Sequence, residues 1–379
     1  MQYDLPSASE EPGVEHPAVQ LSKDLLRSGK THAAVAELRK AAEQTPNDWR
    51  LHASLGDMLM AVGREEEAIG AFMRAVQHEP QLASACVKIG RVFFSRDLST
   101  PALFWLRRAM EIDADREDCL VSLAMAEARF GCRERVADLL DSWVAKDPGD
   151  PVRQHLATAI LGESIPTKAP EEYVEALFDS YAPKFDESLA KLHYCGPKLI
   201  ADAIAEFELP SMGGGNILDV GCGTGLVGES LRPVAQHLVG VDLSQEMLQI
   251  AAGRKLYDEI CHAEMNAFMR SRPRQFNIVV AADVLSYCGD LDEFSAAVEA
   301  TLCPGGRLIV TLEALEEGSD IQGYRLNLSG RFSHQENYLK ECFARHGLTV
   351  RTVSRVPMRH NLGRPVPSLL ATAEKENSG

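Results

Sequence analysis

The sequence contains no closely spaced pair of cysteines, no long apolar run and no excess of basic residues. Its nine cysteines occur singly, without a C-x-x-C pair, so neither zinc ligation nor a thioredoxin-like redox site is expected. An odd number of scattered thiols in a chain of 379 residues is typical of a reducing compartment. We therefore expect a cytoplasmic protein without a metal site.

Membrane and nucleic-acid partners are also not expected. No stretch approaches the length of about 18 apolar residues that a membrane-spanning helix needs. Lys and Arg number 39 against 55 Asp and Glu, which gives a net charge of −16, whereas a nucleic acid requires a basic surface. The first 16 residues lack the basic start and apolar centre of a signal peptide, and their Pro, Ser and Glu content predicts a disordered lead.

An internal repeat occupies the first part of the chain. Aligned at a spacing of 34 residues, small and apolar residues recur in register. The columns are Ala34, Ala68, Ala102 and Val136; Leu38, Phe72, Leu106 and Leu140; and Pro46, Pro80, Ala114 and Pro148. The pattern resembles the tetratricopeptide repeat, a helical hairpin that buries its apolar face against neighbouring copies. The resemblance implies a helical solenoid over residues 17–162 with a capping helix at 151–162. The alternative is an ordinary helical bundle.

The repeats leave two roles open. A stacked array of hairpins forms a concave surface that holds an extended peptide or a helix, which suits a protein partner or a peptide substrate. The alternative is that the array joins two copies of the chain or supports its second half. The sequence gives no preference between them.

Strands and helices alternate after a proline-containing linker at residues 163–170. The strand candidates are 216–220, 237–243, 276–283, 307–313, 349–356 and 368–374. This alternation predicts a doubly wound α/β domain with a mostly parallel sheet over residues 171–379. The last two candidates have no helix between them, so they predict an antiparallel hairpin.

The segment ILDVGCGTGLVGESL places a glycine-rich loop directly after a buried strand. Gly223, Gly225 and Gly228 fit the dinucleotide fingerprint G-x-G-x-x-G, so an NAD-dependent oxidoreductase is one alternative. Asp219 argues against it, because a carboxylate two residues before Gly221 repels a pyrophosphate but attracts the cationic groups of S-adenosylmethionine. The pattern D-x-G-x-G-x-G resembles motif I of class I methyltransferases.

The resemblance continues along the chain and implies a Rossmann-like domain with a seven-stranded sheet. It implies that Asp242, beside Leu243, accepts hydrogen bonds from both ribose hydroxyls. It also implies that Met247 lies near the adenine, that Glu264 binds the adenine amino group, and that Asp283 lies beside the methionine moiety. Together the implied cofactor-binding residues are Asp219, Gly221, Gly223, Gly225, Asp242, Leu243, Met247, Glu264, Asp283 and Tyr181. The alternatives are helix caps for the acids after strands and a core position for Met247.

Residues 171–195 resemble the N-terminal lid of trans-aconitate and ubiquinone-type methyltransferases. The resemblance implies that Tyr181 and Phe185 close over the cofactor, where an aromatic face also attracts the sulfonium. The alternative is an amphipathic helix with its aromatic residues in the core.

The segment GRFSH, residues 330–334, resembles a stretch of predicted bacterial methyltransferases that carry tetratricopeptide repeats. We expect Arg331 to bind an acceptor carboxylate and His334 to act as general base, with Tyr181 completing the catalytic set. The alternative for Arg331 and His334 is a solvated basic residue and a helix cap. Should both lie far from the cofactor, the acceptor pocket would instead be formed by Tyr287, His193 and Tyr194.

These observations predict methyl transfer from S-adenosylmethionine, with S-adenosylhomocysteine as product. The acceptor is a small molecule or peptide that offers an oxygen, nitrogen or carbon nucleophile. The alternative is a scaffold without activity, in which the repeats bind a partner and the cofactor site is vestigial or regulatory.

Overall fold

The computed structural model describes residues 16–131, 133–162, 165–206, 215–315, 323–361 and 364–376. The expected lead at 1–16 lies outside them except for its last residue. The chain forms two compact units, one of residues 1–146 with 361–364, the other of 147–360 with 365–379. Among the described helices, none combines the length and apolar composition that crossing a bilayer requires.

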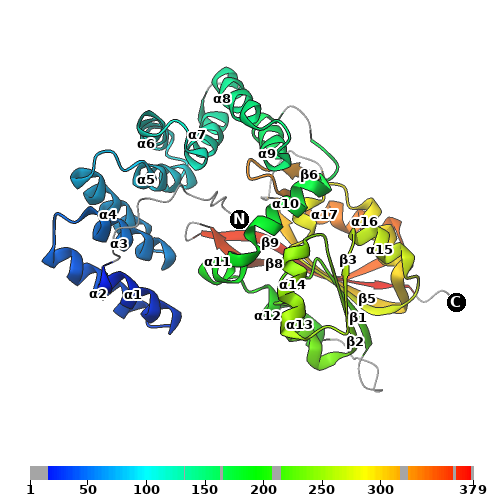
Figure 1. Cartoon of the computed structure of the whole chain (residues 1–379). Helices are drawn as coiled ribbons and strands as arrows, with labels where there is room; N and C mark the ends of the chain where they lie inside the picture. Colours follow the sequence, from blue (N-terminus) through cyan, green and yellow to red (C-terminus); the bar gives the residue numbers. More distant parts are fainter. Residues whose placement is uncertain are drawn as a thin grey trace. The chain divides into compact units, whose positions relative to one another are not determined.

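The first unit consists of helices in pairs (Figure 1). They are α1 (Pro17–Arg27), α2 (Thr31–Gln44), α3 (Trp49–Ala61), α4 (Glu65–His78), α5 (Ala83–Ser95), α6 (Ser99–Ile112), α7 (Glu117–Phe130) and α8 (Arg133–Lys146). The second helices of the pairs begin at residues 31, 65, 99 and 133, each 34 residues after the one before. The sequence period is therefore the period of the helical hairpins.

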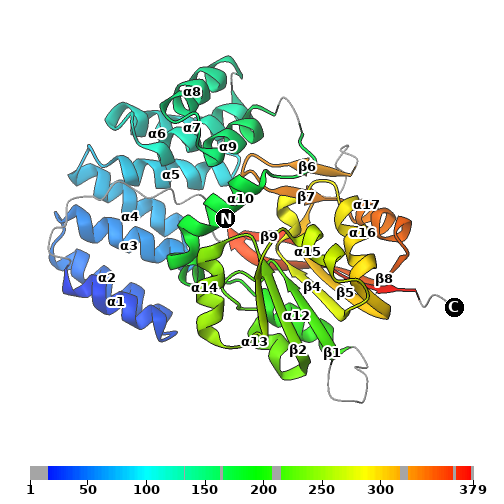
Figure 2. The same cartoon turned by 45° about the vertical axis from the view of Figure 1, so that its right-hand side comes forward.

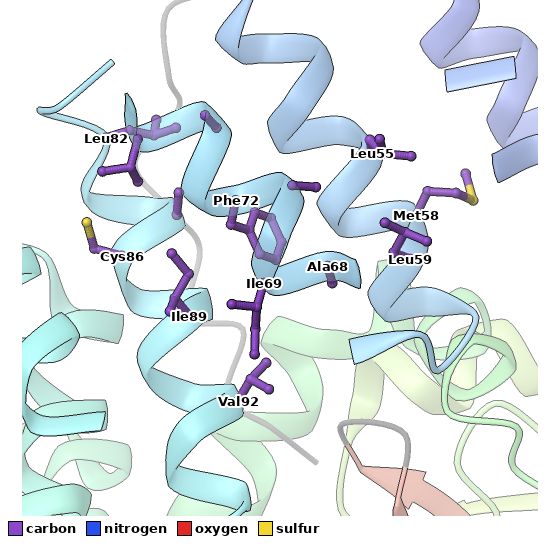
Figure 3. Packing of buried hydrophobic residues seen from close by; sticks show 14 of the residues in the cluster. Leu55, Met58, Leu59, Ala68, Ile69, Phe72, Leu82, Cys86, Ile89 and Val92 are labelled. Atoms are coloured by element: carbon purple, nitrogen blue, oxygen red, sulfur yellow. The ribbon is translucent and has the colours of Figure 1, made fainter. Parts of the chain in front are cut away.

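Two glycines, one in α3 and one in α5, mark places where paired helices approach closely. A Cβ added at Gly56 would lie 2.5 Å from the ring of Phe72, and one at Gly90 would lie 2.6 Å from Leu106 Cγ. Phe72 and Leu106, from the second helix of their pairs, are fully buried. Each packs against a glycine of the first helix, where no side chain occupies the space. Figure 3 shows Phe72 among the apolar side chains of α3, α4 and α5.

The second unit begins with α9 (Pro151–Leu161), which the sequence assigned to the repeats as a capping helix. The structure differs from this assignment, since α9 belongs to the second unit and contacts α10 (Glu171–Tyr181) there. The imidazole of His155 packs on the ring of Tyr173 at 4.0 Å between centroids, and its Nε2 lies 2.9 Å from Gly330 O. Helix α9 thus packs against α10 and the chain at Gly330, both of which belong to the second unit.

The α/β unit contains a nine-stranded sheet, rather than the seven strands expected, within the part of the chain described. Its strands are β1 (Gly215–Val220), β2 (Ala235–Asp242), β3 (Glu259–His262), β4 (Phe276–Ala282), β5 (Leu302–Ala314), β6 (Tyr324–Leu326), β7 (Phe332–His334), β8 (Leu348–Asn361) and β9 (Arg364–Lys375). Strands β3-β2-β1-β4-β5 are parallel, β9 pairs antiparallel with β5, and β8 pairs with β9. The additional strands β6 and β7 form a short antiparallel pair at the end of β5.

Helices cover both faces of the sheet (Figure 2). They are α12 (Gly196–Ala205) and α13 (Gly228–Leu231) on one face, and α15 (Met265–Ser271), α16 (Asp292–Thr301) and α17 (Glu336–Arg345) on the other. Along β1, Ile217 packs with the first set and Leu218 with the second. The alternation puts Asp219 on the same face as Ile217, because side chains of a strand alternate between faces.

The expected linker at 163–170 is partly a docked segment. Residues 163 and 164 lie outside the described residues, but Thr167 O accepts hydrogen bonds from the amides of Gly289 and Asp290. Ala169 N donates to Tyr287 O at 2.8 Å. The segment therefore pairs with the chain that follows β4, and a free linker is not observed there.

Candidate functional site

The glycine loop after β1 turns across the end of β2. Gly221 N donates to Val241 O at 2.7 Å. Gly221, Gly223 and Gly225 have φ of 63°, 53° and 87°, a region that other residues rarely adopt. A Cβ at Gly221 would also lie 2.3 Å from Val284, the second residue after β4. The loop thus lies between the ends of β1 and β4, where strand order reverses and doubly wound sheets bind ligands.

Asp242 ends β2 beside this loop. Its Oδ2 accepts a hydrogen bond from Gly223 N at 2.8 Å and its Oδ1 accepts one from Ser244 N at 2.9 Å. Burial raises the pKa of Asp242, and these two amides oppose the rise. Each carboxylate oxygen keeps a further lone pair, so the group remains able to accept from two vicinal hydroxyls. This geometry fits the ribose role that the sequence predicted.

Asp219 is buried, with 1% of its surface exposed, and its Oδ2 accepts a hydrogen bond of 2.7 Å from the phenol of Tyr257. Burial raises the pKa of Asp219 to about 7, although the bond from Tyr257 lowers it. Tyr257 was not predicted from the sequence. A Cβ at Gly228 would lie 2.5 Å from the Tyr257 hydroxyl, and one at Gly240 would lie 3.0 Å from its ring. These glycines therefore make room for the partner of Asp219.

The remaining residues assigned to the adenosine side have local structural roles. Met247 is fully buried, which favours the core position over an adenine wall. Glu264 accepts a hydrogen bond from Ala267 N at 2.7 Å and caps α15. Leu243 O lies 2.7 Å from Nε2 of His262. The carboxylate of Glu264 thus has a cap partner at the position where the resemblance implied an adenine contact.

Asp283 follows β4 and belongs to a network of buried ions. Its φ is 63°, and Thr311 Oγ1 accepts a hydrogen bond from its amide at 2.9 Å. Its Oδ1 accepts from Arg331 Nη2 at 2.5 Å and its Oδ2 accepts from Arg359 Nη1 at 2.9 Å. Both arginines also donate to Glu313 Oε1. Two carboxylates and two guanidiniums therefore balance one another at the carboxyl ends of β4 and β5.

Glu313 and Arg331 of this network are ionised at neutral pH. Burial by itself raises the pKa of Glu313, but the charges of Arg331 and Arg359 lower it to about 2. Burial opposes the charge of Arg331, yet Asp283 raises its pKa well above the usual value. Because both oxygens of Asp283 accept from guanidinium groups, its carboxylate orients the arginines and is not free to hold a methionine ammonium alone.

The structure corrects the roles expected for Arg331 and His334. Arg331 is 2% exposed and uses all three nitrogens, on Glu313, Tyr287 and Asp283, so it does not offer a fork to an acceptor carboxylate. His334 is fully buried beside the ring of Tyr338, with Nε2 lying 3.1 Å from Gly289 O. Burial lowers the pKa of His334 to about 4. A fully enclosed, weakly basic imidazole is a poor general base for a bound acceptor.

One aromatic ring of the expected lid lies next to the glycine loop, and two others pack against that ring. A Cβ at Gly223 would be 3.8 Å from Phe185, at the start of α11 (Phe185–Lys191). Tyr181 packs edge-on against Phe185 at 6.3 Å, and Phe178 contacts both Phe185 and Tyr287 at 6.0 and 5.4 Å between centroids. The row of rings joins the cofactor loop to Tyr287, whose hydroxyl accepts from Arg331.

Tyr194, one of the alternative pocket residues, lies beside the ionic network. Its neighbours pair with β8, since Leu192 O accepts from His360 N and Cys195 N donates to Met358 O. This pairing places Tyr194 next to Arg359. Burial raises the pKa of the Tyr194 phenol, and the negative charge of Asp283 raises it further. The phenol is therefore neutral at physiological pH. Another alternative, His193, has φ of 51° and packs edge-on against His360.

Comparison with known proteins identifies the central part of this unit. Residues 218–308 match the family model described as "Methyltransferase domain". A ubiquinone biosynthesis O-methyltransferase of Aromatoleum aromaticum is 30% identical over 103 residues, which covers 26% of this chain and 43% of that protein. The corresponding enzyme of Bradyrhizobium diazoefficiens is 30% identical over 169 residues, covering 41% and 65%. Methyltransferase-like protein 27 of Homo sapiens is 33% identical over 118 residues, covering 31% and 47%.

The chain spans less than two thirds of the length of each of these relatives. Among solved structures, an S-adenosylmethionine-dependent methyltransferase from Mesorhizobium loti aligns with a TM-score of 0.38 and 20% identity, over 48% of this chain and 98% of that one. The family match falls on the glycine loop, Asp242 and Asp283. The part of the chain that carries the glycine loop, Asp242 and Asp283 therefore resembles a methyltransferase domain.

Proposed function

We propose that this methyltransferase domain transfers the methyl group of S-adenosylmethionine to an oxygen of a small, planar acceptor. The observation that carries the proposal is the carboxylate of Asp242, oriented by Gly223 N and Ser244 N at the switch point of the sheet. The bound cofactor supplies a methyl group already activated by the sulfonium. The residues of the chain have to hold and align the two reactants rather than activate the donor.

The acceptor lies between the aromatic lid and the ionic network in this proposal. The rings of Tyr181, Phe185 and Phe178 supply a flat apolar wall, which suits a planar molecule. The network of Asp283, Arg331, Arg359 and Glu313 supplies a polar wall with no net charge. The two relatives named as ubiquinone biosynthesis O-methyltransferases support oxygen as the methylated atom.

The proposal assigns roles to a part of the predicted residues. Asp242 binds the ribose hydroxyls, Asp219 favours the positive charge of the cofactor, and the glycine loop admits its methionine part. Tyr181 and Phe185 cover the cofactor from the lid. Tyr194 presents a neutral phenol beside Arg359, where it can donate a hydrogen bond to the acceptor oxygen.

We also propose that the first unit is a tetratricopeptide array. The helical period of 34 residues and the contacts of Gly56 with Phe72 and of Gly90 with Leu106 support this assignment. Its role in the proposal is to bind a protein partner, a peptide substrate or a second copy of the chain. Light scattering of the purified chain separates self-association from the other two.

Calorimetry with the full chain tests the cofactor part of the proposal. S-adenosylmethionine and S-adenosylhomocysteine should bind, whereas NAD should not; binding of NAD alone would contradict the proposal. A panel of phenols, amines and carboxylic acids with methyl-labelled cofactor then tests the acceptor. Cofactor binding without label transfer to any cell-extract component would favour the alternative of a regulatory scaffold.

A further inference from the structure

The lid segment, residues 171–195, carries two carboxylates whose contacts the aromatic rings do not explain. Asp179 lies on α10, and Asp186 lies on α11. Both form hydrogen bonds with residues that follow β1 or β2, the strands that end at the proposed cofactor site. They are separated from their partners by 38 to 68 residues in sequence, so the contacts are tertiary and not part of a local turn.

Asp179 contacts the first turn of α14 (Gln245–Arg254), the helix that follows Asp242. Ser244 Oγ donates to Asp179 Oδ1 at 2.6 Å, and Glu246 N lies 3.3 Å from the same oxygen. Ser244 Oγ also accepts from Met247 N at 3.1 Å, while Ser244 N donates to Asp242. Ser244 thus connects the lid carboxylate directly to the ribose carboxylate, and the helix N-terminus favours the added negative charge.

Asp186 contacts the glycine loop and the other end of α14. Thr224 Oγ1, 1% exposed as a residue, donates to Asp186 Oδ1 at 2.6 Å. Arg254, the last residue of α14, donates to Asp186 Oδ2 and to Glu229. The lid therefore contacts both ends of α14, through Asp179 at the first turn and Asp186 at the last residue. It also contacts the glycine loop, through Asp186 and Thr224.

We propose that Asp179 and Asp186 form a two-point clasp that keeps the lid closed over the cofactor, so that cofactor release requires both contacts to break. The two residues act as positioning residues, because they touch the loops and not the reacting atoms. This inference rests on the proposed cofactor site between the lid, the glycine loop and Asp242.

The test measures the dissociation rate of S-adenosylhomocysteine from the full chain by stopped-flow displacement. Asp179→Ala and Asp186→Ala should each speed dissociation about five- to tenfold, the size of one partly exposed charge-assisted hydrogen bond. Asp186→Asn keeps an acceptor for Thr224 and loses the ion pair with Arg254, so its rate should fall between those of wild type and Asp186→Ala. Glu187→Ala, which removes a neighbouring carboxylate whose side chain is 61% exposed and pairs with Lys191, should match wild type.

Two further readouts separate a clasp from a general loss of structure. Added sodium chloride should speed dissociation from wild type more than from Asp186→Ala, because salt screens the pair of Asp186 with Arg254. Thermal unfolding of Asp186→Asn should remain close to that of wild type. Dissociation rates of both alanine variants equal to that of Glu187→Ala would overturn the clasp alone. A wild-type chain that does not bind S-adenosylhomocysteine would overturn the proposed function as well.

Discussion

The phenol of Tyr257 donates a 2.7 Å hydrogen bond to Asp219, the carboxylate in the strand before the glycine loop. Tyr257 lies between α14 and β3, and Asp219 lies in β1, so the contact joins two adjacent strand–helix units. It places a nearly enclosed carboxyl whose pKa is about 7 next to the proposed cofactor. The charge of this group consequently changes within the physiological pH range.

The first prediction concerns this titration. An ionised Asp219 attracts the cationic cofactor, so the affinity for S-adenosylmethionine should rise as pH increases through about 7. Asp219→Asn should lower the affinity and remove this part of the pH dependence. Tyr257→Phe removes the bond that lowers the pKa, so it should move the midpoint to higher pH. Calorimetry across pH measures all three; a midpoint unchanged in Tyr257→Phe would contradict the assignment.

The same shift predicts a change in stability. Asp219 binds a proton more readily in the folded chain than its unfolded pKa of about 3.9 implies. The free energy of unfolding contributed by this group should therefore fall as pH rises from about 4 through about 7. Asp219→Asn should flatten that part of the profile in urea denaturation.

The second prediction concerns Asp242. Asp242→Ala should cost roughly 2–4 kcal/mol of cofactor affinity, the size of two charge-assisted hydrogen bonds. The variant also leaves Gly223 N and Ser244 N without their acceptor, so it should lose about 1–2 kcal/mol of unfolding free energy. Asp242→Asn keeps one acceptor oxygen, so its cofactor affinity and its free energy of unfolding should lie between those of wild type and Asp242→Ala. Normal cofactor binding by Asp242→Ala would assign the carboxylate to the loop alone.

The third prediction concerns the ionic network. Arg359→Met leaves Asp283 and Glu313 with one buried guanidinium instead of two, which should cost about 3–5 kcal/mol of unfolding free energy. Adding Glu313→Gln should recover part of the loss, because the charges balance again. Arg351→Met on the same strand is the control, since its pair with Glu374 is exposed and contributes no more than about 1 kcal/mol. Equal losses for Arg351→Met and Arg359→Met would argue against the buried network.

The fourth prediction concerns the boundary of the α/β unit. A fragment of residues 147–379 should bind S-adenosylhomocysteine as the full chain does. A fragment of residues 168–379 lacks His155 and the apolar side of α9, so Tyr173 loses its cover. Exposing one large side chain costs about 1.5–3 kcal/mol, which should appear as a lower unfolding midpoint. Equal unfolding midpoints for the two fragments would indicate that α9 belongs to the repeats and does not stabilise the α/β unit.

Local patterns predicted most of the fold. Continuous apolar runs located β1, β2, β4 and β5, because burial on both faces of a strand leaves few polar positions. The last two strand candidates of the sequence fall on β8 and β9. The glycines of the loop after β1 have the positive φ that restricts the residue type there, whereas the ribose role of Asp242 stays a prediction. The short strands β3, β6 and β7 were not identified, because three or four residues carry too little periodicity.

The acceptor side was predicted less well. Arg331 and His334 were placed at the site from their chemistry, but their environment depends on pairing between distant strands. Arg359 binds Asp283 across 76 residues of sequence, and no local pattern indicates that contact. For Glu264 the local pattern was ambiguous. An acidic residue directly before a helix is expected for a helix cap and equally for an adenine ligand, and the structure shows the cap.

The ring of Tyr257 occupies space that Gly225, Gly228 and Gly240 leave empty. These positions therefore cannot change independently of one another. A side chain at Gly228 or Gly240 would be tolerated only after position 257 had become small, and a small residue at 257 would leave a cavity until a glycine was replaced. Any change from this packing arrangement to another therefore passes through a less stable variant, so Tyr257 and these three glycines are expected to change together in evolution.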